Sequence, residues 1–250
     1  MPHRAITAVL ASAFLLGVQA SFSSAGDDQA VSTTDDARVL MLEEARAVQS
    51  MDHFAVSHQV DITTTTPHYN QTTHAYIKTW VQRPGHVRAE SQQYTRNETI
   101  VSDGSTTWIY DAGNRTYWSQ RGGAPAALFA NAFPGLARQL SNANLPAVIT
   151  SARLVGTESL TITGRSYPCN IVDISITPGA AEAMLQDNLL RLWISRDYKV
   201  PLRVEATLGA APQDHKKYAD YVTDFEPDMS IPASVWTFKP PPDAKQRSYN

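Results

Sequence analysis

The sequence predicts an α+β protein of mainly β structure, in which a strongly curved antiparallel sheet forms a half-barrel and short helices cover its concave face. After one amphipathic helix, most of the chain alternates apolar and polar residues with the period of two that is typical of strands. Turn residues such as Asp103-Gly104 separate these segments at short intervals, which favours successive antiparallel strands. Strands do not alternate with long helices, so a parallel sheet is not expected.

The N-terminus has the pattern of an export signal. Met1–Arg4 is a short positive region, Ala5–Ala20 is mostly small and apolar, and small residues precede Ala25 as a signal peptidase requires. We expect cleavage after Ala25, a flexible leader over residues 26–34, and a single domain over residues 35–250. The apolar run is shorter than the roughly 20 residues that a transmembrane helix needs. We therefore expect a soluble mature chain, without a transmembrane segment, in the periplasm.

Composition argues against several classes of protein. The net charge is −3, and removal of the signal takes away Arg4 and no acidic residue, which changes the charge from −3 to −4. The basic residues are scattered, so we expect no nucleic-acid partner. No cysteine lies near the cleavage point to carry a lipid anchor. Cys169 has no second cysteine to pair with in the chain, and we interpret it as a small buried hydrophobe, with a reactive or intermolecular thiol as the alternative.

A first helix is expected over about residues 35–49. Apolar residues recur there at helical spacing. They are Val39, Leu42 and Ala45, with Val48 as a further candidate. Asp35 and Asp36 lie near the positive end of this helix, where negative charge is favourable. The acidic pair Glu43-Glu44 is expected to lie on its solvated face.

Strands follow, with turns between them. The first runs over Phe54–Ile62, where every second residue from Phe54 alternates with solvent-facing partners. Arg83-Pro84-Gly85 interrupts the chain before a strand over His86–Tyr94, and Asp111–Asn114 forms another turn. Later strands are expected at Arg153–Leu160, Arg165–Ile176, Leu190–Ser195, Val200–Leu208, His215–Phe225 and Val235–Phe238.

A helical segment interrupts the β pattern between Gly122-Gly123 and Pro146. Its apolar residues are spaced by 4, 3 and 4 and so share one face. They are Phe129, Phe133, Leu136 and Leu140. Pro134-Gly135 is expected to kink or split the segment. Two interpretations stand side by side: a mobile lid over the concave apolar mouth of the sheet, or a helix packed permanently on one sheet face.

Three stretches resemble the periplasmic LolA/LolB lipoprotein-carrier superfamily, which includes RseB-like regulators and uncharacterised branches of the outer-membrane lipoprotein-sorting type. Lys78–Pro84 is an aromatic strand that ends in Arg-Pro, and Ile100–Tyr110 is a Ser-Asp-Gly turn that enters a Trp-hydrophobe-Tyr strand. Trp236–Pro241 contains the Phe-x-Pro-Pro pattern with which such domains close. The chain is longer than a typical carrier and adds a helix-like insertion at Pro178–Leu185, while Leu192–Arg203 looks more like the sensor and uncharacterised branches.

The resemblance implies a curved sheet and short helices around a hydrophobic cavity for lipoprotein acyl chains. It also implies that Arg83, directly before the proline, hydrogen-bonds to a helical lid and holds the empty cavity shut. A guanidinium suits this role because it carries five donors. Without the resemblance, Arg83 would be interpreted as a solvent-facing charge at a strand end.

Alternation along the strand before Pro84 separates two sets of side chains. Ile77, Thr79, Val81 and Arg83 share one face, which we expect to look inward, and Tyr76, Trp80 and Gln82 share the other. Trp108 and Tyr110 alternate with Thr107 and Ile109, and the sequence does not settle which set faces the concave side. The aromatic residues are interpreted either as core or as ligand contacts. The candidate cavity and lid residues are Ile77, Thr79, Val81, Arg83, Trp108, Tyr110, Phe129, Phe133 and Leu136.

The sequence predicts a binding protein rather than an enzyme. It contains no nucleophile elbow, phosphate-binding glycine loop or zinc motif, and its histidines lack metal-ligand spacing. We expect no catalytic residue, metal or cofactor. The predicted function is periplasmic binding and carriage of lipid or lipoprotein acyl chains, with inner- and outer-membrane transfer partners. The alternative is an RseB-like sensor that binds lipoprotein or a regulatory protein domain, and the third interpretation is an enzyme with an unrecognised site.

Overall fold

The computed structural model describes residues 35–93, 97–124, 129, 132–134, 149–176, 185–211 and 214–247. The chain divides into Met1–Ala30 and Val31–Asn250, and every described residue belongs to the second unit. The predicted signal peptide and leader fall outside the described residues. So do most of the segment between residues 125 and 148 and the insertion over residues 177–184. Within the described residues, no helix is long and apolar enough to span a membrane.

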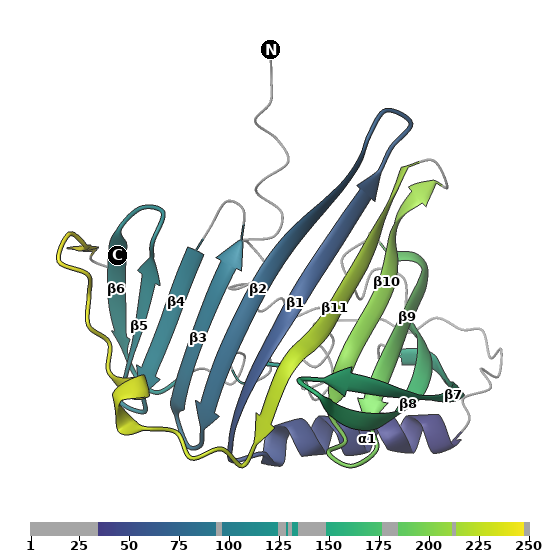
Figure 1. Cartoon of the computed structure of the whole chain (residues 1–250), viewed down its shortest axis with the longest axis horizontal. Helices are drawn as coiled ribbons and strands as arrows, with labels where there is room; N and C mark the ends of the chain where they lie inside the picture. The colour runs from purple at the N-terminus through teal and green to yellow at the C-terminus, as the bar shows by residue number, and fades with distance from the viewer. Residues whose placement is uncertain are drawn as a thin grey trace, which may run out of the picture. The chain divides into compact units, whose positions relative to one another are not determined.

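The described strands form one twelve-stranded sheet (Figure 1). Its order is β12-β6-β5-β4-β3-β2-β1-β11-β10-β9-β8-β7, and each strand is antiparallel to its neighbours except β12, which runs parallel to β6. The strands are β1 (His53–Thr65), β2 (Asn70–Gln82), β3 (His86–Gln93), β4 (Asn97–Asp103), β5 (Thr106–Asp111), β6 (Thr116–Arg121), β7 (Ile149–Ile162), β8 (Arg165–Ile176), β9 (Leu185–Ser195), β10 (Pro201–Ala211), β11 (Asp214–Pro227) and β12 (Lys245–Gln246).

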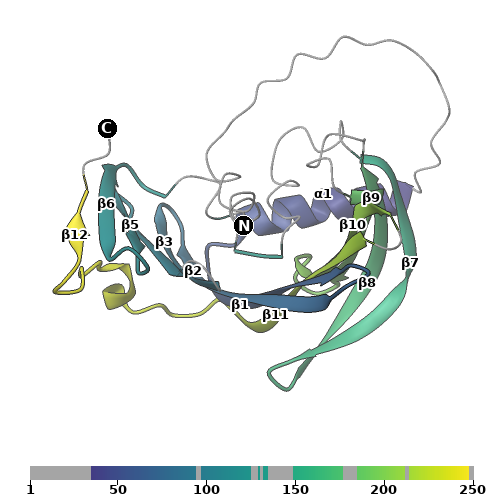
Figure 2. The same ribbon diagram turned by 90° about the horizontal axis from the view of Figure 1, so that it is seen from above.

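The sheet is open and curved. Strands β7 and β12 are its two edges, and Figure 2 shows the strands bending away from β1 and β11 on both sides while helix α1 (Asp35–Ser50) lies on the concave side. The predicted α+β class, with a mainly β half-barrel, is confirmed. Strand β8 has the expected bounds, whereas β7, β9, β10 and β11 extend beyond the segments that the alternation indicated.

Helix α1 has the expected bounds but buries a different face from the one predicted. Val39 is 53% exposed, so the expected apolar stripe is wrong at its first position. The residues that the helix buries are Ala37, Leu40, Met41, Glu44 and Val48. This face also follows helical spacing, but an acidic residue lies at its centre. A pattern of apolar residues alone therefore placed the buried face about one residue away from where it lies. The expectation of a solvated Glu44 is wrong for the same reason.

Two core clusters lie between the sheet and its cover. The first core cluster joins Val48 at the end of α1 to Phe54, Val81 and Phe225 of the sheet and to Phe133. Cys169 also belongs to it and is fully buried, as the sequence predicted. The second core cluster joins the N-terminal half of α1 to strands β7 to β10. Its members are Ala37, Leu40, Met41, Ala152, Val172, Ile174, Leu190, Leu192, Ile194 and Val204.

The C-terminal segment departs from the predicted strand over Val235–Phe238. Residues Ala233–Trp236 form a short 3-10 helix, η2, in which the Val235 amide donates to the Pro232 carbonyl at 3.0 Å. Prolines flank this segment and have no amide hydrogen for a strand ladder. The local turn therefore replaces the β pairing that the apolar alternation suggested.

Candidate functional site

Strand β2 buries some of the side chains that the alternation placed on one face. Val81 belongs to that cluster, and Thr79, two residues earlier, is 1% exposed. Ile77 is partly buried on the same side of the strand. The opposite face carries Tyr76, which is half exposed, and Trp80, whose ring lies 4.8 Å from the Lys78 ammonium. The period of two in a strand produces this separation.

Arg83 ties the end of β2 to the end of α1. Its Nε donates to the Met51 carbonyl at 2.9 Å, and its Nη2 donates to the Val48 carbonyl at 3.2 Å. The last carbonyls of a helix lack partners within the helix and carry partial negative charge, which suits a guanidinium. The Phe129 ring centroid lies 4.4 Å from the guanidinium carbon. Burial lowers the pKa of Arg83 below its usual value, while the Asp52 charge opposes this effect.

Two phenylalanines of the predicted cover lie against the concave face. Phe129 and Phe133 are both buried in the first core cluster. The Phe133 ring lies 5.2 Å from the Phe54 ring and 5.7 Å, edge-on, from the Phe225 ring. Such aromatic pairs stabilise a packed layer beyond the burial of their area. Leu136, the third predicted residue of this segment, lies outside the described residues.

Trp108 and Tyr110 lie on the opposite face of β5 from Ile109, which packs against the first core cluster. Their ring centroids are 6.1 Å and 6.5 Å from that of Phe238 in the C-terminal segment. The structure therefore separates these two residues from Phe129 and Phe133. Whether they contact a ligand stays a prediction, and on this face a ligand would have to displace Phe238 to stack on them.

The sequence interpretation missed Glu44 at the interface between α1 and the sheet. Its side chain is 0% exposed, and neither carboxyl oxygen has a hydrogen-bond partner among the described residues. Burial raises the pKa of Glu44 from 4.5 to about 8, so its neutral form predominates at pH 7. The spacing of Ala37, Met41, Glu44 and Val48, by 4, 3 and 4 residues, is a signal in the sequence that places Glu44 on the buried face.

A second buried polar group lies on the sheet. The Nδ1 atom of His58 lies 2.7 Å from Oδ1 of Asp220, and the Tyr218 hydroxyl donates to Oδ2 of the same carboxylate at 3.0 Å. The Nε2 atom of His58 is buried without a hydrogen-bond partner among the described residues. Burial, and then the Asp220 charge, raises the pKa of Tyr218 well above 10. Strand alternation placed His58 on the same face as its apolar neighbours. No local pattern predicts its contact with Asp220, which lies 162 residues further along the chain.

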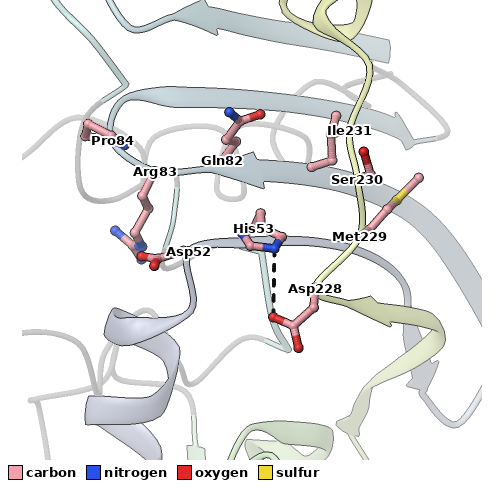
Figure 3. A pocket seen from close by; sticks show the side chains of 9 residues that line it. All are labelled: Asp52, His53, Gln82, Arg83, Pro84, Asp228, Met229, Ser230 and Ile231. Atoms are coloured by element: carbon pink, nitrogen blue, oxygen red, sulfur yellow. Dashed lines mark ion pairs between the residues drawn. The ribbon is translucent and has the colours of Figure 1, made fainter.

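An open pocket of about 790 Å³ lies at the rim of the sheet (Figure 3). It is lined by Asp52, His53, Gln82, Arg83, Pro84, Asp228, Met229, Ser230 and Ile231. Nε2 of His53 lies 4.0 Å from the Asp228 carboxylate across this pocket. Figure 3 shows Arg83 turned towards Asp52 and the end of α1. This one side chain therefore lines the rim pocket and is hydrogen-bonded to the chain at the end of α1.

The described part of the chain contains no cluster of three or more histidine, cysteine or acidic side chains that would suit a metal ion. Burial, as the main cause, raises the pKa of the Cys169 thiol to about 11, and its Sγ donates to the Tyr167 carbonyl at 3.3 Å. This environment disfavours a thiolate and hence a reactive cysteine.

Part of the chain is similar to a known protein family. A family model described as "Predicted periplasmic protein (DUF2092)" matches residues 37–132. That family is thus a predicted periplasmic one, although its model covers less than half of the chain. No curated protein sequence matches.

Solved structures similar to this chain include MucB of Pseudomonas aeruginosa in its complex with MucA, at 16% identity and a TM-score of 0.46, over 82% of this chain and 61% of that chain. This chain therefore spans less than two thirds of the MucB length. LprF of Mycobacterium bovis matches at 12% identity and a TM-score of 0.43, over 80% of this chain and 97% of that chain. A LolA superfamily protein of Nitrosomonas europaea matches at 12% identity and a TM-score of 0.30, over 81% of this chain and 97% of that chain.

These identities and TM-scores support no statement about ligand or partner. The similar structures include both MucB and a LolA superfamily protein. At these identities the likeness is one of fold alone.

Proposed function

We propose that this protein binds acyl chains of lipids or lipoproteins on the concave face of its sheet and carries them across the periplasm, without catalysis. The observation that supports this most directly is that α1 and the residues Phe129 and Phe133, together called the cover, lie over an apolar face of the sheet. Phe129 and Phe133 pack on that face, and Arg83 connects the Phe129 ring, the end of α1 and strand β2. In this proposal an acyl chain takes the place of the two rings and contacts Ile77, Thr79 and Val81.

The energetics suit a carrier. Burial from water is worth about 0.8 kcal/mol per methylene, so a chain of about 16 carbons gains on the order of 12 kcal/mol. Free diffusion of such a ligand is negligible. Transfer from a bilayer to the concave face exchanges one apolar environment for another and is nearly balanced. A cover whose opening costs a few kcal/mol then decides between loading and release.

Arg83 is the proposed latch of this cover. Hydrogen bonds to charged groups contribute about 1.5–3 kcal/mol each, and Arg83 donates two to the carbonyls at the end of α1. That sum lies in the range of a conformational equilibrium that ligand binding can shift. Leu136 is a further proposed cover residue.

The proposed setting is the periplasm, after export and cleavage near Ala25 and with membrane acceptors as transfer partners. The match of residues 37–132 to a predicted periplasmic family supports this setting. The single domain over residues 35–250 is part of the same proposal.

The test is native mass spectrometry of protein purified gently from a bacterial periplasm, followed by extraction and identification of bound lipid. Ile77→Asp places a charge on the concave face, and Lys78→Asp places one on the opposite face of the same strand as a matched control. We expect co-purified acylated ligand that is lost in Ile77→Asp and retained in Lys78→Asp. A protein that is empty in all forms, and that takes up no fluorescent fatty acid, would refute acyl-chain binding.

The position of Arg83 favours a second candidate, an RseB-like sensor. This side chain lines the rim pocket and also holds the cover, so ligand entry that displaced Arg83 would alter a surface open to a protein partner. A carrier is expected to exchange its ligand with acceptor vesicles. A sensor is expected to form a stable complex with a regulatory domain whose affinity changes when ligand is bound.

A further inference from the structure

Glu44 and His58 are two buried polar side chains whose hydrogen-bonding capacity is unused in the described structure. Glu44 is 0% exposed, and neither carboxyl oxygen has a partner. His58 is 3% exposed, and its Nδ1 is engaged by Asp220 while its Nε2 has no partner. An unsatisfied buried polar group costs about 1–3 kcal/mol, so two of them in one layer point to a group that is absent from the described residues.

The packing places both side chains in the same layer between α1 and the sheet. One turn before Glu44, Met41 belongs to the second core cluster together with Val204. One turn after it, Val48 belongs to the first core cluster together with Val222. On the sheet, the strands β10 and β11 that carry these two valines are neighbours.

The register of β11 connects this position to His58. Asp220 pairs directly with Val204 on β10, and Val222, two residues further along β11, pairs directly with His58 on β1. Val204, Asp220, Val222 and His58 therefore occupy adjoining positions of the sheet, and the core clusters that contain the two valines also contain Met41 and Val48, the residues on either side of Glu44. Apolar residues surround this spot on both the helix and the strands.

We propose that Glu44 and His58 bind the hydroxyl group of a neutral amphiphile, such as a monoacylglycerol, whose acyl chain lies along the concave face. This inference rests on the proposed function, because it names the polar end of the ligand whose chain that function describes. It assigns the helix and β1 a role in selecting the ligand.

The chemistry of the two side chains favours a hydroxyl. Asp220 accepts from the Tyr218 hydroxyl through Oδ2, and its Oδ1 lies 2.7 Å from Nδ1 of His58. In the tautomer in which Nδ1–H donates to Asp220, Nε2 of His58 is an acceptor. A neutral Glu44 carboxyl has one O–H donor and acceptor capacity as well. A ligand hydroxyl is both a donor and an acceptor, so in this proposal it donates to His58 Nε2 and accepts from Glu44.

An anionic head group fits this spot poorly. Asp220 is 1% exposed and already supplies an acidic side chain next to His58, and Glu44 is a second buried acid in the layer. A fatty-acid carboxylate or a phosphate would add a further negative charge in a desolvated layer, which is costly without a cationic partner. A methyl ester of the same acyl chain has no hydroxyl and offers only acceptors, so it cannot donate to Nε2.

The experiment compares two probes that share one chain length. Purified mature protein is incubated with phospholipid vesicles that contain monopalmitoylglycerol and methyl palmitate in equal amounts, and the bound ratio of the two probes is measured by mass spectrometry after separation. Differences in vesicle partitioning cancel when this ratio is compared between protein variants. The variants are Glu44→Leu and Glu44→Gln, with Glu43→Leu as a matched control, because Glu43 is 45% exposed and pairs with Lys199 at 3.4 Å.

We expect the ratio of monopalmitoylglycerol to methyl palmitate to fall about three- to tenfold in Glu44→Leu, which corresponds to one net hydrogen bond. Glu44→Gln keeps a polar group and is expected to fall less, and Glu43→Leu is expected to match the unaltered protein. A ratio unchanged by Glu44→Leu would overturn the inference and assign the two groups to structural water, with acyl-chain binding intact. Preferential uptake of the phospholipid would likewise overturn the inference and leave acyl-chain binding intact. No uptake of any lipid would overturn the proposed function as well.

Discussion

Replacement of Glu44 with glutamine is expected to stabilise the fold at neutral pH and to change its pH dependence. The pKa of Glu44 is raised from 4.5 to about 8 by burial. The folded chain thus holds this proton more tightly than the unfolded chain, so the unfolding free energy falls as the pH rises from about 4.5 towards 8 and levels off above that. Each unit of pKa corresponds to about 1.4 kcal/mol. At pH 7 the acid therefore costs on the order of 3 kcal/mol, a large part of the 5–15 kcal/mol typical of a folded domain.

The assay is urea unfolding at a series of pH values between 5 and 9, in the unaltered protein, in Glu44→Gln and in Glu43→Gln. Glu44→Gln has no titrating carboxyl, so its stability relative to the unaltered protein is expected to grow by about 1 kcal/mol per pH unit between pH 5 and 8. The Glu43 variant is expected to follow the unaltered protein, since its side chain is nearly half exposed. Parallel curves for Glu44→Gln and the unaltered protein would refute the burial of an ionisable carboxyl at this position.

Three further changes test other parts of the structure. Arg83→Leu removes two hydrogen bonds to the end of α1, so hydrogen exchange of the amides there is expected to accelerate at least tenfold, whereas Arg121→Leu, at an exposed site, leaves it unchanged; equal rates would contradict the latch. Gly85→Ala would place its Cβ 2.9 Å from the Gly104 Cα, whereas Gly164→Ala shares a positive φ but meets open space. Both are expected to lose about 1–2 kcal/mol from backbone strain, and Gly85→Ala a further 1–3 kcal/mol from the clash, as measured by thermal unfolding. Cys169, with a thiol pKa of about 11, is expected to resist alkylation at pH 8 in the folded chain and to react in urea; rapid labelling without urea would show that this core opens.

The sequence predicted much of the sheet because its signals are local. Alternation with a period of two and turn residues such as Asp103-Gly104 act within a few positions, and these features located most of the strands between β1 and β11. The strand predicted over Val235–Phe238 failed because the alternation there competes with nearby prolines, which cannot donate to a ladder. The pairing of β1 with β11 joins distant segments, and no pattern along the chain predicts it.

The site was predicted in part for the same reason. The inward face of β2 follows from alternation alone, so Thr79 and Val81 were placed with Arg83 on one side. Helix periodicity failed at α1, because an apolar search does not accept Glu44 as a buried residue. The environment of His58 depends on Asp220, which a bulge between Ser57 and His58 and a distant strand bring into place. Buried polar pairs of this kind are properties of the tertiary fold.

The position of the two buried polar groups that lack hydrogen-bond partners supports a binding role for the concave face of the sheet. A leucine at position 44 would continue the apolar contacts of Met41 and Val48 and remove the cost of a buried acid, so stability alone does not explain Glu44. Both unpartnered groups, Glu44 and His58 Nε2, lie in the layer between α1 and the sheet. The end of the same helix is tied to β2 by the two hydrogen bonds that Arg83 donates. A ligand that supplied partners to both groups would remove the cost of leaving them unsatisfied, which is how binding would stabilise this layer.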